Sequence, residues 1–165
     1  MPDLQPNPTG AGYFNAVSYG GTDIFFEIAS NVSGNTPIGT LVEVNNYTGP
    51  GTTNPPVVAT EKPSSTTADS NDVGVVTGGY EATTGAASIP PGAVAKIATF
   101  GVAQVLCDAT TTAGFPLIQS AATAGAAKCT TSGAAPTNGQ GIGVALQAVT
   151  ISSGTALVWA LLKPM

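Results

Sequence analysis

Hydrophobic and polar residues alternate over short stretches of this chain, with the period of two that half-buried β-strands show. In residues 23–28, the side chains of Ile24, Phe26 and Ile28 share one face, and residues 40–45 alternate in a similar way. Between such stretches lie many of the chain's 21 glycines and 13 prolines, which favour turns. The pattern predicts short strands, and segments with a helical period are nearly absent.

A run of further strands is expected from residue 73 onward. These are residues 73–77, 93–100, 101–107, 115–119, 126–130, 142–151 and 155–163. Their spacing is typical of antiparallel hairpins, whereas residues 49–56 and 61–72 favour long loops. For residues 120–139 the sequence is compatible with either a short helix or a turn, because glycine interrupts the runs of alanine. The expected fold class is all-β, a small antiparallel β-barrel or sandwich with long Gly/Pro-rich loops.

The last expected strand, residues 156–162, is apolar on both faces. Such a strand is normally covered on both sides, so we expect it within the barrel or at a subunit contact. Trp159 and Leu161 from this strand, with Phe26 from the first, are the predicted core or subunit-interface anchors. Trp159 is expected to be buried.

Charge is scarce in this chain and does not point to a charged partner. Charged residues make up 8% of the 165 residues, the formal net charge is −5, and the four lysines are scattered. Without a basic patch there is little to neutralise phosphates, so nucleic acid is not an expected partner. No apolar run reaches the roughly 18 residues of a membrane span, so no membrane association is expected either. The N-terminal residues lack the features of a secretory signal.

Most catalytic machinery is also missing from the sequence. The chain has no histidine, so a Ser or Cys nucleophile would lack its usual general base. A carboxylate pair acting on a glycosidic bond is formally open, but spacing selects none among Asp23, Glu27, Glu43, Glu61 and Glu81. We therefore expect no catalytic residues, no enzyme activity, no metal site and no cofactor.

Three apparent motifs have simpler interpretations. Residues 139–143 are glycine-rich but precede a strand instead of opening a helix, so we interpret them as a turn and not a phosphate loop. Residues 69–74 faintly resemble a calcium loop, but Val73 occupies a ligand position; an Asx-rich turn is favoured, with a weak surface cation as the alternative. Cys107 and Cys129 are interpreted as two reduced thiols, with Cys107 packed in the sheet, and a disulfide is the alternative.

The order of these signals carries a family resemblance. Short strands bounded by glycine recur at residues 37–42, 57–58, 73–76, 91–98, 101–106, 114–118, 141–146 and 154–162. This succession resembles the small β-barrel head-decoration, or cement, proteins of tailed bacteriophages. The similarity covers roughly residues 38–162 and rests on the cadence of the strands, without chemically specific residues.

The resemblance implies a structural virion protein that binds the outside of the expanded capsid and cements neighbouring capsomers. Its partners would be the major capsid protein and further copies of itself, a trimer being preferred over a dimer. It would be made in the bacterial host cytoplasm and reside on the outer capsid surface. Members of the family commonly lay an extended N-terminal segment on the capsid. Here that arm would use Leu4, Tyr13, Phe14 and Tyr19.

The implied organisation is an arm with the first strand in residues 1–35, followed by a β-barrel decoration domain in residues 36–165. Two other classes compete with this interpretation. The first is a carbohydrate- or receptor-binding β-module of a phage tail or surface protein, which would need exposed aromatic side chains. The second is a shell or tail-tube subunit, which would assemble into large particles when expressed alone.

Overall fold

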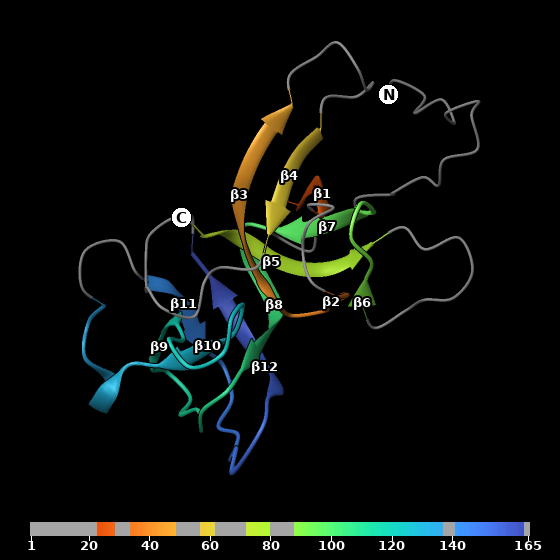
Figure 1. Cartoon of the computed structure of the whole chain (residues 1–165). Helices are drawn as coiled ribbons and strands as arrows, with labels where there is room; N and C mark the ends of the chain where they lie inside the picture. Colours follow the sequence, from red (N-terminus) through yellow and green to blue (C-terminus); the bar gives the residue numbers. More distant parts are fainter. Residues whose placement is uncertain are drawn as a thin grey trace.

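The computed structural model describes residues 23–28, 34–48, 57–61, 72–79, 88–136 and 141–163. Within these ranges the chain is all-β, as its alternation predicts, and the only helical element is a single 3-10 turn, η1, at Thr131–Gly133 (Figure 1). The strands are β1 Asp23–Ile28, β2 Thr36–Pro37, β3 Leu41–Thr48, β4 Val57–Glu61, β5 Asp72–Gly79, β6 Ser88–Ile89, β7 Val94–Ala98, β8 Gly101–Cys107, β9 Pro116–Gln119, β10 Ala127–Cys129, β11 Gly141–Ala145 and β12 Ala156–Leu162.

The first five-stranded sheet closes into a barrel in the order β1-β4-β3-β5-β7. Strand β1 completes the ring, because it pairs antiparallel with β7, with Asp23 opposite Ala98, and parallel with β4. The remaining pairs in this barrel are antiparallel. A boundary between residues 35 and 36 therefore divides strands that belong to one sheet.

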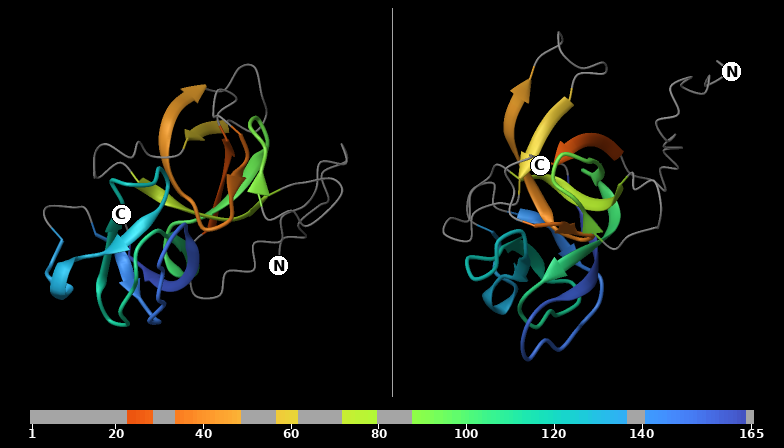
Figure 2. Two further views of the ribbon diagram at one scale, coloured as in Figure 1. Left: turned by 60° about the horizontal axis from the view of Figure 1, so that its bottom comes forward. Right: turned by 45° about the vertical axis from the view of Figure 1, so that its right-hand side comes forward.

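The second five-stranded sheet closes in the order β10-β8-β12-β11-β9. Its pairs are antiparallel except for β10 with β8, which meet in parallel at Ala127 and Cys107. The short strands β2 and β6 form a separate antiparallel pair. The described strands thus form two small barrels, and two further views separate the orange-to-green barrel from the teal-to-blue one (Figure 2).

The buried hydrophobic residues form two clusters, and one of them spans both barrels. Strands β3 and β5 bury both faces where they carry adjacent apolar residues: Leu41 and Val75 pack in a cluster with the interior of the second barrel, while Val42 and Val76 pack with Ile97 of the first. Strands covered on both sides carry adjacent apolar residues in place of strict alternation, which explains the Leu-Val and Val-Val pairs at these positions. The barrels are consequently held together by packing as well as by the short β7–β8 connection.

The C-terminal half departs from the expected strands at one place. Strand β11 ends at Ala145, so the expected strand at residues 142–151 is too long. Beyond it, Val149 forms an isolated bridge with Thr111, whose hydroxyl donates to the carbonyl oxygen of Gln147 at 3.1 Å and accepts from the Val149 N–H at 3.1 Å. These bonds give the backbone after β11 partners outside the sheet. For residues 120–139 the sequence is compatible with a short helix or a turn. The described part of this stretch contains the short strand β10 and the 3-10 turn η1.

Candidate interaction surface

The outer face of the β8–β12 pair is apolar. On β12, the side chains of Val158, Ala160 and Leu162 point inward and are fully buried, which leaves Leu157 and Trp159 on the outside. On β8, buried Ala103, Val105 and Cys107 alternate in the same way with Val102, Gln104 and Leu106. The antiparallel register places Leu161 opposite Val102, Trp159 opposite Gln104, and Leu157 opposite Leu106. Two neighbouring strands therefore present their outward rows side by side.

A third strand extends this face. Strand β11 pairs with β12 through Val144 and Leu161, and the N–H of Leu146 donates to the carbonyl oxygen of Trp159 at 2.8 Å. Leu146 is 48% exposed, so Trp159 has Gln104 on one side and Leu146 on the other. We call the exposed group the Trp159 patch, and its members are Val102, Gln104, Leu146, Leu157, Trp159 and Leu161.

The sequence-based expectation for Trp159 and Leu161 needs a correction. Neither residue belongs to the core of the chain, because Trp159 is 45% exposed and Leu161 is 41% exposed. The reason is that β12 forms part of the wall of a small barrel and has only one interior face. The subunit-interface alternative for these two residues stays a prediction.

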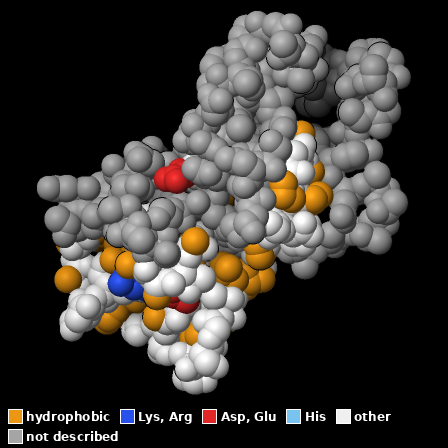
Figure 3. Space-filling view, viewed as in Figure 1, with side chains coloured by type: hydrophobic (Ala, Val, Ile, Leu, Met, Phe, Trp, Pro, Cys, Tyr) orange, Lys and Arg blue, Asp and Glu red, His pale blue; other side chains and the backbone are white. Residues whose placement is uncertain are grey.

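In the space-filling view, hydrophobic side chains gather at the surface over the middle of the molecule (Figure 3).

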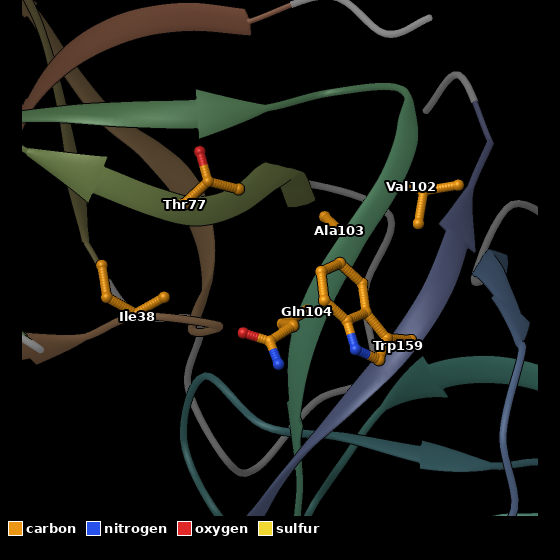
Figure 4. Close-up of a pocket in the computed structure, with 6 residues that line it drawn as sticks. All are labelled: Ile38, Thr77, Val102, Ala103, Gln104 and Trp159. Carbon is orange, nitrogen blue, oxygen red and sulfur yellow. The ribbon is translucent and has the colours of Figure 1, made fainter. Parts of the chain in front are cut away.

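A hollow of about 210 Å³ adjoins the patch between the two barrels. Its lining residues are Ile38, Thr77, Val102, Ala103, Gln104 and Trp159. Figure 4 shows the Gln104 amide beside the Trp159 indole, with Ile38 and Thr77 contributed from the other barrel. The Thr77 hydroxyl donates to the backbone oxygen of Lys96 at 3.3 Å. The hollow thus offers an aromatic face, aliphatic walls and one side-chain amide.

Charged residues lie at the ends of the patch and not within it. Asp108 directly follows β8, and its Oδ2 accepts a 2.6 Å hydrogen bond from the buried hydroxyl of Ser120. Lys163 directly follows β12 and is exposed. Because β8 and β12 run antiparallel, Asp108 and Lys163 lie at opposite ends of the two-strand face. The patch therefore has an acidic end and a basic end.

The other residues predicted for the site lie wholly or partly outside the described residues. Leu4, Tyr13, Phe14 and Tyr19 lie outside the described residues, and so does the side chain of Phe26, of which the backbone in β1 is described. Sequence reasoning also missed Val102, Gln104, Leu146 and Leu157 as surface residues. Only Leu157 lies in the apolar run of β12, which is a signal because a strand in a small barrel wall leaves one of its two apolar faces outside.

The two cysteines are free thiols in the structure. Cys107 is fully buried in β8, as expected for a cysteine packed in the sheet, whereas Cys129 is half-buried. Burial, with smaller contributions from nearby Cys129 and Asp108, raises the pKa of the Cys107 thiol from 9.0 to about 12. A thiol with such a pKa stays protonated and unreactive near neutral pH, so Cys107 fills space in the core.

The described residues hold neither a cluster of metal ligands nor a membrane-spanning helix. No group of three or more His, Cys, Asp or Glu side chains gathers there in a way that could hold a metal ion. None of the described residues forms a helix with the length and apolarity of a membrane span. No protein-family model and no curated protein matches this chain.

Proposed function

We propose that this chain is a structural protein of a bacteriophage virion, which binds the outer surface of the expanded capsid and cements neighbouring capsomers. The observation that carries the proposal is the Trp159 patch, an uncharged apolar surface on an all-β chain. Contiguous apolar patches of several hundred Å² mark interaction sites on soluble proteins. Without histidine, and with few charges, the chain is better equipped for contact than for chemistry.

Two further considerations support a role in assembly. The strand cadence that resembles the head-decoration family is realised as closed barrels, and closed sheets lack the free edges that promote uncontrolled pairing. A subunit that contacts several neighbours at once also binds firmly through modest individual interfaces, because later contacts form at high effective concentration. The proposed partners are the major capsid protein and other copies of this chain. The proposed location is the outer capsid surface, after synthesis in the bacterial cytoplasm.

The test is cosedimentation of the purified protein with expanded, undecorated phage heads. The full chain is compared with a variant that lacks residues 1–21, the proposed arm, and unexpanded heads serve as the control particle. Saturable binding to expanded heads that weakens on truncation would support a capsid-binding cement protein with an arm. Absence of binding by the full chain would overturn the proposal.

A second candidate function is favoured by one observation, the exposure of Trp159 beside Gln104 at the mouth of the hollow. Aromatic faces with a neighbouring amide suit the apolar face and hydroxyl groups of a sugar, as in a carbohydrate- or receptor-binding module. The aliphatic surroundings fit this function less well, because sugars require several polar partners. Titration of the intrinsic fluorescence of Trp159, the single tryptophan, with a panel of glycans tests it. Trp159→Phe should retain glycan binding and Trp159→Ala should abolish it, measured by isothermal titration calorimetry because both variants lack the only tryptophan.

A further inference from the structure

We infer that the Trp159 patch is the contact surface for a second copy of this chain, packed face to face in antiparallel orientation about a two-fold axis near Trp159. This inference uses the same patch as the proposed function but does not require capsid binding: a patch covered by a second copy would leave the capsid contact to other residues. It concerns a specific surface, symmetry and stoichiometry, and it favours a dimer where the family resemblance favours a trimer.

The first argument is the internal symmetry of the patch. Seven residue pairs join β8 to β12, from Gly101 with Leu162 to Cys107 with Ala156, and Trp159 with Gln104 is the middle pair. On either side of it lies an aliphatic pair, Val102 with Leu161 towards one end and Leu106 with Leu157 towards the other. A two-fold axis through the middle pair exchanges these two aliphatic pairs.

Such an exchange brings like surfaces together. In an isologous interface the same patch is used by both copies and must therefore complement itself. Here the aliphatic pair at one end would face the aliphatic pair at the other end, and Trp159 would lie at the centre. Central aromatic anchors surrounded by aliphatic contacts are the usual arrangement of residues that dominate binding energy.

The second argument is charge complementarity, which selects the antiparallel orientation. Asp108 and Lys163 lie at opposite ends of the β8–β12 face. If the two copies were related by an axis parallel to the strands, Lys163 would approach Lys163 and Asp108 would approach Asp108. An axis perpendicular to the strands instead brings Lys163 of each copy towards Asp108 of the other. Opposite charges at an interface rim fix register and disfavour the wrong alignment.

The third argument is the available area. Val102, Leu146, Leu157, Trp159 and Leu161 are between 38% and 55% exposed. With 150–250 Å² for a full aromatic side chain, and somewhat less for an aliphatic one, they expose on the order of 450 Å². Two copies would together cover on the order of 1,000 Å², which is the lower limit for a specific interface. An area of this size is enough for a specific, reversible dimer.

Sedimentation equilibrium of the full chain over a wide concentration range tests the surface. We expect a monomer–dimer equilibrium that Trp159→Ala weakens at least about 30-fold, the effect typical of a central anchor. The matched control is Thr131→Ala, a change on the exposed η1 turn after β10, which lies away from β12 in the ring. Circular dichroism checks that both variants fold. The inference would be overturned if the chain stayed monomeric or formed a trimer. It would also be overturned if Trp159→Ala left the dimerisation constant unchanged.

Charge reversal tests the orientation. Lys163→Asp and Asp108→Lys should each weaken the dimer about tenfold at low salt, since each replaces two attractive rim contacts with repulsive ones. Because Asp108 also accepts from Ser120, Asp108→Asn controls for loss of that local bond. Mixing the two reversed variants should restore dimers of wild-type strength, as every opposed pair then has opposite charges. Mixtures that associate no better than the separate variants would overturn the antiparallel arrangement.

These experiments are separable from capsid binding. A monomeric chain that cosediments with expanded heads would overturn the dimer and leave the proposed function standing. A dimer that does not bind capsids would overturn the proposed function and leave the inferred dimer standing.

Discussion

The carbonyl oxygen of Gly39 accepts a 2.7 Å hydrogen bond from the backbone N–H of Leu106, and this bond joins the two barrels. The N–H of Gly39 donates in the other direction, to the carbonyl oxygen of Val76 at 2.7 Å. Gly39 has a φ of +88°, a conformation that glycine adopts readily and residues with a Cβ do not. A Cβ at this position would contact Leu157 and lie 2.9 Å from the Leu106 nitrogen. Gly39 therefore permits the barrels to approach closely.

Replacement of Gly39 by alanine should destabilise the junction. The left-handed conformation costs a residue with a Cβ about 1–2 kcal/mol, and forcing an extra methyl group into packed surroundings adds about 1–3 kcal/mol. Gly92→Ala is the matched control, since Gly92 has a φ of +79° with nothing within 4 Å of its added Cβ. Urea unfolding of both variants should show the larger loss for Gly39→Ala. Equal losses would mean that close approach of the barrels is not the cause.

Buried threonines should respond to valine substitution in opposite directions. The Thr111 hydroxyl makes the two hydrogen bonds to Gln147 and Val149 described above, whereas the buried hydroxyl of Thr40 has no partner among the described residues. Thr111→Val should lower the free energy of unfolding by about 1 kcal/mol, because the part-buried carbonyl oxygen of Gln147 loses its donor and the Val149 N–H keeps only its 3.3 Å bond to the Thr111 carbonyl oxygen. Thr40→Val should leave it unchanged or raise it by about 1 kcal/mol, because a desolvated hydroxyl is removed. Thermal unfolding of the two variants compares their stabilities. If Thr40→Val lost as much stability as Thr111→Val, the Thr40 hydroxyl would have a hydrogen-bond partner after all.

The fold class was predictable from the sequence because alternation is a local property. Strands β1 and β8 have the bounds predicted from the sequence. The division into two barrels was not predictable, because it depends on which strands pair over long distances. Parallel pairing of β1 with β4, for instance, has no local signal.

The candidate surface was predictable only in part. The apolar run of β12 correctly singled out Trp159 as an unusual residue, but the same pattern fits a strand covered on both faces and a strand with one exposed apolar face. Strands β3 and β5 are of the first kind, with Leu41 and Val42 both buried, and β12 is of the second. Burial depends on neighbours that local sequence does not specify, so the choice required the three-dimensional arrangement.

The two thiols should differ in reactivity. Cys129 is half-buried, while Cys107 is fully buried with a raised pKa. With a disulfide reagent at pH 8, we expect one thiol to react in the folded chain and the second only on unfolding, since reaction requires an accessible thiolate. Cys129→Ala should remove the fast phase and Cys107→Ala should leave it. Rapid reaction of both thiols in the folded chain would contradict the burial of Cys107.

The raised pKa of Cys107 also predicts how stability depends on pH. Below pH 9 the thiol is protonated in both the folded and the unfolded chain, so it makes no difference to their balance. Between pH 9 and about 12 the unfolded chain releases this proton while the folded chain retains it, because burial disfavours the thiolate. Since the unfolded state then binds fewer protons, the free energy of unfolding falls as pH rises, by at most about 1.4 kcal/mol per pH unit from this group.

The effect of Cys107 on this pH dependence is isolated by comparison with Cys107→Ala. That variant should be less stable than the parent chain at pH 7, because truncation leaves a small cavity. Its stability should nevertheless fall less steeply above pH 9, so the difference between the two chains should shrink as pH rises. Urea unfolding at intervals from pH 7 to pH 11 measures both curves. Parallel curves would show that the thiol ionises equally in the folded and unfolded chains, which a buried thiol with a raised pKa does not do.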